Sequence, residues 1–140
     1  MLLLTKEKMD EKTAALLNPL QLAYIGDAVW EMYVRQSLML QRLNVHHMHN
    51  ECIRRVNAKA QEECMARLPD KLNEAETSIA QRGRNAHARH PSPRNQHPAD
   101  YAEATAFEAL VGYLYLTDQQ QRLQEILDFV FESGTGSARE

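Results

Sequence analysis

The sequence of 140 residues lacks any apolar run near the roughly 18–20 residues that a membrane-spanning helix needs. It has two cysteines, Cys52 and Cys64, and their spacing fits neither a disulfide framework nor a CxxC pair. Charged residues follow the apolar residues 1–4 at once, so no signal peptide is predicted. These absences predict a cytoplasmic protein that makes no membrane contact and whose cysteines are small apolar side chains.

Signals for β-structure are also scarce. The sequence has five glycines, no Asn-Gly or Asp-Gly hairpin signal, and no convincing alternation of apolar and polar residues. Helical periodicity dominates instead, so we predict an all-α protein. A single domain is expected over residues 1–133, long enough to bury a real core, followed by a flexible tail over residues 134–140.

Capping residues and periodicity place the expected helices along the chain. The expected ranges are about 6–17, 19–38, 45–68 with a restart at Asn57, 73–83, 100–116 and 118–132. Asn18 followed by Pro19 is typical of an N-cap with proline at the first helical position. Asn73 with Glu76 resembles a capping box. Three prolines and the lack of periodicity predict a loop over residues 84–98.

The net charge of -3 conceals a basic segment. Residues 77–99 contain no acidic side chain, and they include Arg82, Arg84, Arg89 and Arg94. A phosphate backbone responds to the local electrostatic field and not to the mean charge of the protein. The segment therefore indicates a nucleic-acid partner.

The stretch LAYIGDAVWE, residues 22–31, places an aspartate in the middle of an apolar helix. On a helical wheel the expected core stripe is Leu22, Ile25, Val29, Met32 and Tyr33. Asp27 lies away from that stripe, but its neighbours on the wheel, Ala23 and Trp30, are apolar as well. An isolated ionised carboxylate in such surroundings costs several kcal/mol unless a cation, a metal or hydrogen-bond donors compensate.

The stretch YAEATAFEALVGYLYL, residues 101–116, repeats the pattern with Glu108. Its core stripe is Phe107, Leu110, Val111 and Leu114. Ala104 and Gly112 lie above and below Glu108, and such small residues allow another helix to approach closely. Two carboxylates cannot neutralise each other, and hard oxygen ligands suit Mg²⁺, so a shared divalent cation is one solution. In the alternative, Asp27 caps a neighbouring helix and Glu108 pairs with Arg35 or Arg54.

Three segments resemble a known family in the same order. LAYIGDAVWE resembles the signature of ribonuclease III endonuclease domains, and ATAFEALVGYLYL resembles their second acidic helix. RGRNAH, before a proline-bearing loop, makes the match closer to the small Mini-ribonuclease III branch, and the resemblance covers about residues 18–127. It implies an all-helical homodimer that cleaves double-stranded RNA with Mg²⁺, without an appended double-stranded-RNA-binding domain.

The resemblance also implies which residues act. Asp27 and Glu108 match two of the four carboxylates that surround the metal in the full-size enzymes, so both are expected to be catalytic metal ligands. Ala23 and Thr105 stand at the other two positions, which implies more water in the metal shell. The expected products carry 5′-phosphate and 3′-hydroxyl ends. The expected substrate is the precursor of the large-subunit (23S) ribosomal RNA.

Candidate RNA contacts come from two segments. They are Arg82, Gly83, Arg84, Asn85, His87 and Arg94 in the basic segment, with Asn57 and Gln61 in VNAKAQ. Proteins recognise A-form duplexes through shape, phosphates and 2′-hydroxyls, which suits arginine and amide donors and a glycine that allows close approach. By contrast, the three histidines of HHMHNE lack the i, i+4 spacing of a helical metal pair, and they are interpreted as a helix entry.

Two other functions compete with a nuclease. The first is a non-catalytic RNA-binding or ribosome-assembly module on a degenerate nuclease fold, which Ala23 and Thr105 favour and the joint presence of Asp27 and Glu108 disfavours. The second is a Mg²⁺-dependent nucleotide pyrophosphatase. Such enzymes need several acids on each of two paired helices, whereas each helix here offers one well-placed carboxylate.

Overall fold

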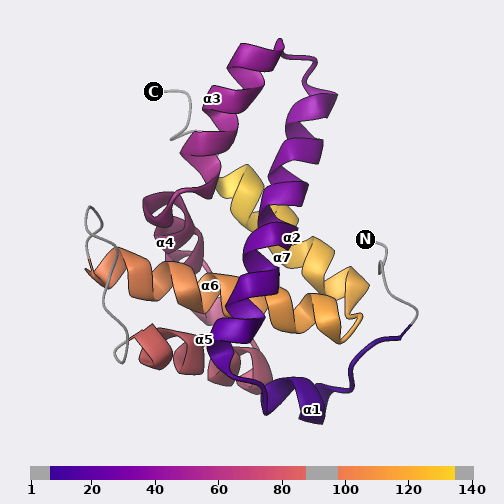
Figure 1. The fold of residues 1–140 in the computed structure, drawn as a ribbon, viewed down its shortest axis with the longest axis vertical. Helices are drawn as coiled ribbons and strands as arrows, with labels where there is room; N and C mark the ends of the chain where they lie inside the picture. Colours follow the sequence, from indigo (N-terminus) through magenta and orange to yellow (C-terminus); the bar gives the residue numbers. More distant parts are fainter. Residues whose placement is uncertain (1–6, 88–97, 135–140) are drawn as a thin grey trace.

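The computed structural model describes residues 7–87 and 98–134, and every regular element in these ranges is helical (Figure 1). The elements are α1 (Glu11–Ala15), α2 (Pro19–Leu40), α3 (Val45–Val56), α4 (Ala58–Ala66), the short 3₁₀ helix η1 (Pro69–Lys71), α5 (Glu74–His87), α6 (Pro98–Leu116) and α7 (Gln120–Ser133). The all-α prediction is confirmed. Among the described helices, none is both long and apolar enough to span a membrane. Residues 135–140 of the expected tail lie outside the described residues.

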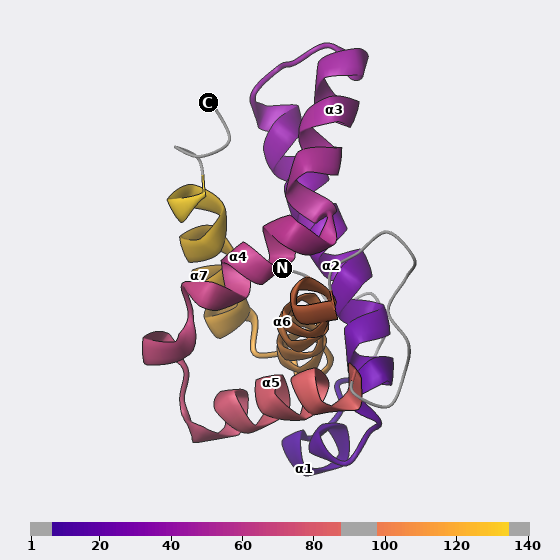
Figure 2. The ribbon, with the colours of Figure 1, turned by 90° about the vertical axis from the view of Figure 1, so that its left-hand side faces the viewer.

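Helix α6 is the central element of the fold. Figure 2 shows it nearly end-on, with α2, α4 and α5 arranged around it, and these three helices make its most extensive contacts. The stripe expected from the sequence is buried, because Phe107, Leu110, Val111 and Leu114 are all 0% exposed. Trp30 of α2 packs edge-on against Phe107, with ring centroids 5.2 Å apart. A helix that is apolar on nearly all sides is stable only when other helices cover it.

Two glycines let the backbones of α2 and α6 touch. A Cβ atom at Gly26 would lie 1.7 Å from the carbonyl oxygen of Glu108, and one at Gly112 would lie 1.9 Å from that of Leu22. Both distances are far below van der Waals contact, so only glycine fits at either position. This crossing brings the residue after Gly26, which is Asp27, to the part of α6 that carries Glu108.

The close crossing also changes which face of α2 is buried. Leu22 and Val29 are buried as expected, but Met32 is 60% exposed, and Ile25 and Tyr33 are only partly buried. The other buried positions of α2 are Ala23, Gly26, Trp30, Val34 and Leu38. The expected stripe is therefore partly wrong. The glycine and alanine contacts rotate the helix so that part of its apolar surface faces outward.

The caps read from the sequence are present. The side chain of Asn18 accepts a hydrogen bond from the Leu20 amide (2.9 Å), and Pro19 opens α2. Asn57 accepts one from the Ala60 amide (2.8 Å) and starts α4. In the capping box of α5, the backbone amide of Asn73 donates to the Glu76 carboxylate at 3.0 Å. The backbone amide of Glu76 donates in return to the side-chain oxygen of Asn73 at 2.8 Å. Local hydrogen bonding thus fixes three helix starts.

Several helix boundaries differ from the prediction: α1 begins only at Glu11, and α6 begins at Pro98 and not at residue 100. Two further differences have a clear structural cause. Helix α5 continues past Gly83 to His87, because Gly83 is buried against α6, where its Cβ position is 3.1 Å from the Ala106 Cα. This glycine serves close helix packing and does not end the helix. Helix α7 begins at Gln120 and not at residue 118, because Asp118 has a left-handed backbone with φ of 55°.

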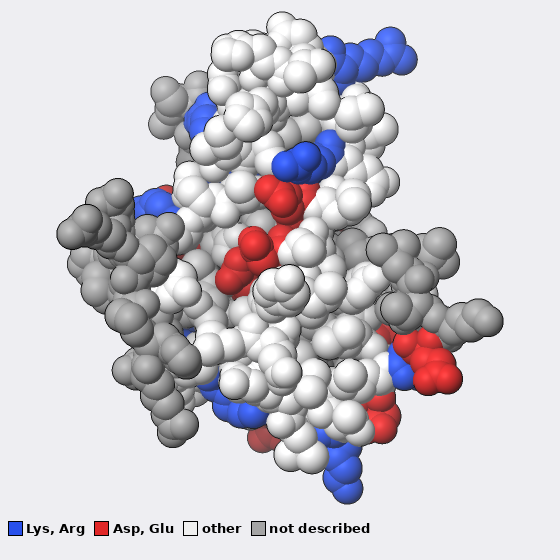
Figure 3. Space-filling model, viewed as in Figure 1, with Lys and Arg blue, Asp and Glu red and all other residues white. Residues whose placement is uncertain are grey.

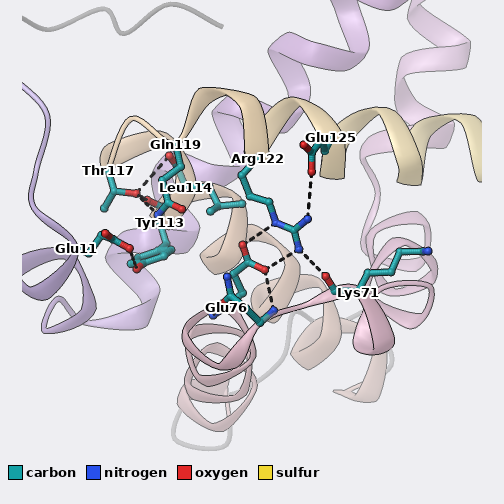
Figure 4. A network of polar contacts seen from close by, with 10 residues as sticks. Glu11, Lys71, Glu76, Tyr113, Leu114, Thr117, Gln119, Arg122 and Glu125 are labelled. Carbon is teal, nitrogen blue, oxygen red and sulfur yellow. Dashed lines mark hydrogen bonds and ion pairs between the residues drawn. The ribbon is translucent and has the colours of Figure 1, made fainter.

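A buried acid on α5 links this helix to α7 and η1 (Figure 4). Glu76 of α5 is 1% exposed and forms a two-pronged ion pair with Arg122 of α7, with both N–O distances at 2.8 Å. Arg122 also donates to the Lys71 carbonyl of η1. Burial alone raises the pKa of Glu76, but hydrogen bonds from Arg122 and the Asn73 amide outweigh it and lower the pKa. This carboxylate is therefore fully occupied in holding the fold.

Candidate functional site

Asp27 of α2 and Glu108 of α6 meet where their helices cross. The side chain of Asp27 lies close enough to Glu108 to raise the pKa of that carboxyl group. Asp27 is exposed and Glu108 is partly buried, so the pair joins the surface to the interior. Figure 3 shows acidic side chains gathered near the middle of this face, where α2 crosses α6. The structure thus brings together the two acids singled out in the sequence.

The environment of Glu108 strongly favours its protonated form. Burial, followed by the hydrogen bond and the negative charge of Asp27, raises the pKa of Glu108 to about 9. The nearby side chain of Gln61 acts in the opposite direction and lowers the pKa. At neutral pH, and without a cation, Glu108 therefore keeps its proton.

The exposure of Asp27 corrects one expectation. The sequence predicts an apolar environment around it, and its neighbours Ala23 and Trp30 are indeed buried. Asp27 itself faces solvent because α6 covers only one side of α2 at this level. The desolvation penalty therefore falls on Glu108, and Asp27 remains accessible to a ligand from solution.

Nearby basic side chains are engaged elsewhere. Arg35 pairs with Glu31 at 3.5 Å, and Arg54 pairs with Glu51 at 3.0 Å. Over residues 7–87 and 98–134, no ion pair joins a lysine or arginine to Asp27 or Glu108. The alternative in which Arg35 or Arg54 neutralises Glu108 is therefore wrong.

The donor set fits a hard divalent cation that retains most of its water. The described ranges hold no group of three or more His, Cys, Asp or Glu residues suited to a metal. The candidate protein ligands are therefore the two carboxylates of Asp27 and Glu108. Ala23 and Thr105 are buried, and the Thr105 hydroxyl donates to the Tyr101 carbonyl at 2.9 Å. Mg²⁺ is commonly held by one or two carboxylates and several waters. Asp27 and Glu108 meet that requirement, and a cation between them offsets their mutual repulsion.

Two of the arginines predicted to contact RNA hold the protein together. Arg82 of α5 donates to the carbonyl of Ala15, the last residue of α1, and to that of Leu17 just beyond it, the second at 3.1 Å. Arg84 forms an ion pair with Glu103 of α6, which raises the pKa of Arg84. Both side chains thus have intramolecular partners, and the structure gives them a part in fixing α5 against its neighbours.

Two further RNA candidates lie inside the protein. Gly83 is buried against α6, with its Cβ position 3.0 Å from the Ala109 Cβ, so it offers no backbone to an RNA strand. Gln61 is 2% exposed and lies against Glu108 instead of facing a groove. The prediction of surface contacts at these two positions is wrong.

The remaining RNA candidates are exposed or lie outside the description. Asn57 and Asn85 are exposed, although both side chains make local hydrogen bonds. Asn85 and Arg82 line a groove of about 550 Å³ with residues 16–20. The side chain of His87 and the whole of Arg94 lie outside the described residues. Lys59 is also exposed, although the sequence analysis did not select it, and its Nζ atom lies 3.9 Å from Asp100 Oδ1.

A second, apolar groove of about 810 Å³ lies between α2 and α7. Its apolar lining includes Ile25, Ala28, Met32, Leu40, Tyr115 and Phe131. Within it, Met32 is 60% exposed and Leu40 is 81% exposed. This groove collects the outward-facing apolar side chains of α2.

Comparison with known proteins gives a consistent result. The family model described as Ribonuclease III domain matches residues 20–119. A Mini-ribonuclease 3 of Symbiobacterium thermophilum is 46% identical over 112 residues, which covers 79% of this chain and 85% of the relative. One from a Thermoanaerobacter species is 43% identical, over 80% of this chain and 79% of the relative. A crystal structure of a Fusobacterium nucleatum protein superimposes with a TM-score of 0.76 at 28% identity, covering 84% of this chain and 94% of that one.

Proposed function

Because the chain belongs to the Mini-ribonuclease 3 branch of the ribonuclease III family and is an endoribonuclease, we propose that it cleaves double-stranded or structured RNA at Asp27 and Glu108 with Mg²⁺. The observation that carries this proposal is the contact between two carboxyl groups that no lysine or arginine of the described residues neutralises. The proposed products carry 5′-phosphate and 3′-hydroxyl ends.

The two acids have different tasks in this reaction. A bound Mg²⁺ supplies a water of lowered pKa and neutralises charge on the phosphate oxygens. Asp27, which faces solvent, holds the cation and orients the attacking water. Glu108 would release its proton to solvent when the cation binds and would complete the site from the buried side. Neither step requires a nucleophilic serine, cysteine or histidine.

The proposed substrate is the large-subunit ribosomal RNA precursor in the cytoplasm, and family resemblance supports it. The exposed donors Asn57 and Asn85, with His87 and Arg94, are the proposed phosphate contacts. Without the Arg82 and Arg84 donors, which have intramolecular partners, binding by one catalytic domain is expected to be weak and strongly dependent on salt.

Incubation of the purified protein with duplex RNA or nucleoside triphosphates, in Mg²⁺ or Ca²⁺, tests the proposal. The expected result is internal cutting of the duplex with Mg²⁺, no cutting with Ca²⁺ and intact triphosphates. Binding of RNA without cutting in either metal would favour the non-catalytic RNA-binding module instead. Hydrolysis of triphosphates alone would favour the pyrophosphatase.

We also propose that the apolar groove between α2 and α7 binds a second copy of this chain. The groove lies on α2, the same helix that carries Asp27, and its lining includes the exposed apolar side chains of Met32 and Leu40. Membership of a family of dimeric nucleases supports a second copy as the occupant. A twofold arrangement would cover the same face in both subunits.

Met32→Glu is expected to convert the dimer into a monomer, because a carboxylate would be buried without a partner in the interface. Light scattering after gel filtration measures the mass. Tyr24→Glu is the matched control, since Tyr24 lies on the same helix, is 85% exposed and does not line the groove. An unchanged mass for Met32→Glu, or a monomeric parent protein, would contradict the dimer proposal.

Stabilisation by Mg²⁺ is expected to grow with pH. The pKa of Glu108 rises from 4.5 to about 9 on folding, so the stability from its proton is complete below about pH 4.5 and is lost as the pH rises through about 9. Mg²⁺ competes with that proton. A fixed Mg²⁺ concentration should therefore raise the Tm more at pH 9 than at pH 6. In Glu108→Gln the pH dependence of this increment should vanish, and equal increments in the parent protein would contradict the competition.

A further inference from the structure

A small pocket beside the C-terminal end of α7 collects positive charge. Its volume is about 200 Å³, which is room for a tetrahedral oxyanion with a few waters, since one water occupies about 30 Å³. The charged side chains among its described lining residues are Arg54, Arg55 and Arg67, with Glu63 as the one carboxylate. The acidic pair is not part of this lining. The pocket therefore has a surplus of two positive charges.

The end of α7 explains why two of these arginines meet, because α7 has no basic residue in its own last turn. Nη1 of Arg55 donates to the Phe131 carbonyl, and Nη1 of Arg67 donates to the Val130 carbonyl, both at 3.1 Å. A helix leaves the acceptors of its last turn unpaired, and its dipole attracts cations there. A Cβ atom at Gly134 would lie 3.3 Å from Arg67 Nη2 and 3.5 Å from Arg55 Nη1. The two guanidinium groups are therefore neighbours.

Hydrogen bonds to carbonyls leave the charge of these two arginines in place. Within residues 7–87 and 98–134, no ion pair joins either guanidinium to a carboxylate. Burial lowers the pKa of Arg55, the negative charge of Glu51 opposes that shift, and the positive charge of Arg67 adds to it. In the same part of the chain, the Nε–H of Arg55 is buried and has no hydrogen-bond partner. Such a donor is rare in native proteins, and a bound ion is one reason for it.

Aromatic contacts fix the position of Arg55. Its guanidinium lies over the Phe131 ring, with Cζ 4.2 Å from the ring centroid. The indole Nε1 of Trp30 donates to the Arg55 carbonyl at 3.0 Å, and Trp30 also lines the pocket. A guanidinium held against an aromatic ring is pre-organised to donate two parallel hydrogen bonds to a phosphate.

We propose that the pocket lined by Arg54, Arg55 and Arg67 binds a phosphate group. A doubly charged phosphate matches the surplus of two positive charges, and its oxygens suit the fork of an arginine. The contacts with α7 are compatible with this role, because each guanidinium has further N–H donors besides the one that a carbonyl accepts. Free inorganic phosphate and a phosphate of an RNA strand present the same chemistry to the pocket.

Trp30 reports on the pocket directly, because it lines the pocket and is the one tryptophan of the sequence. Inorganic phosphate is titrated into the RNA-free protein at constant ionic strength, with chloride as the reference anion. The expected result is a saturable change in Trp30 fluorescence with phosphate and none with chloride. Arg67→Gln is expected to raise the phosphate Kd by about tenfold or more, because it removes a charged hydrogen-bond donor.

Arg35→Gln is the matched control. Arg35 has a side chain that is 66% exposed, and it does not line the pocket, so the variant removes the same charge from an unrelated surface position. Its phosphate Kd should stay within about twofold of the parent value. A response to phosphate no larger than the response to chloride would overturn the proposal. Equal increases in Kd for Arg35→Gln and Arg67→Gln would also overturn it, because net charge would then explain the binding.

Competition with duplex RNA identifies the source of the phosphate. The titration is repeated with RNA in EDTA, which prevents metal-dependent cleavage. Loss of the phosphate response in the presence of RNA supports an RNA strand as the source. An unchanged response supports free phosphate.

A measurement on the unmodified protein covers the case in which Arg67→Gln does not fold. Phosphate is expected to shift the NMR signals of the Arg55 Nε–H and the Trp30 indole N–H, with the same Kd as the fluorescence change. Shifts confined to residues outside the pocket would overturn the proposal.

Discussion

Asp27→Asn is expected to slow cleavage of duplex RNA by about a thousandfold or more while the protein still binds RNA. An amide retains the shape of the carboxylate but loses the charge that holds the cation on the solvent side. Loss of about 4 kcal/mol of transition-state stabilisation corresponds to three factors of ten in rate. Single-turnover cleavage and a filter-binding isotherm in Ca²⁺ measure the two quantities.

Asp70→Asn is the control for this result. Asp70 is exposed in η1, and it has no part in the acidic pair. Its cleavage rate should stay within about twofold of the parent, as is usual for surface substitutions. Cleavage by Asp27→Asn at a rate close to that of the parent would contradict the role of the carboxylate.

Gly112→Ala is expected to destabilise the protein by about 3 kcal/mol or more. The added methyl group would lie 1.9 Å from the Leu22 carbonyl oxygen, and two helix backbones would have to separate to accept it. Urea titration followed by circular dichroism measures the free energy of unfolding.

Two other glycines supply a graded comparison. Gly83→Ala should be milder, because its nearest neighbour is the Ala109 Cβ at 3.0 Å. Gly134→Ala should be nearly neutral, because the closest atom is the end of the flexible Arg67 side chain, at 3.3 Å. Equal effects for Gly112 and Gly134 would show that α2 and α6 do not meet at backbone contact.

Local signals in the sequence predict the helices well. Asn18, Asn57 and Asn73 each act within three residues of the helix start that they cap, so a capping pattern contains the necessary information. The ribonuclease III fold predicted from three short segments is confirmed by the family match and the structural neighbour. The end of α5 is not predicted, because Gly83 meets α6 only in the folded protein.

The sequence predicts which two acids form the site, but it does not predict how buried each one is or which side chains surround it. Asp27 and Glu108 stand out because each is an acid in an apolar stretch. The sequence does not indicate which of them is buried, since that depends on how α2 crosses α6. It also cannot show that Arg84 is paired with Glu103, or that Gln61 turns inward to Glu108. These contacts join residues that are distant along the chain.

The most direct test of the central claim is a crystal structure with Mn²⁺ in place of Mg²⁺, measured for anomalous scattering. The account predicts a single strong peak between the carboxyl oxygens of residues 27 and 108, at about 2.2 Å from the nearest oxygen of each, a little longer than for Mg²⁺. A peak elsewhere, with Asp27 and Glu108 still in contact and no cation between them, would contradict the account. An ion pair between either acid and an arginine would also contradict it.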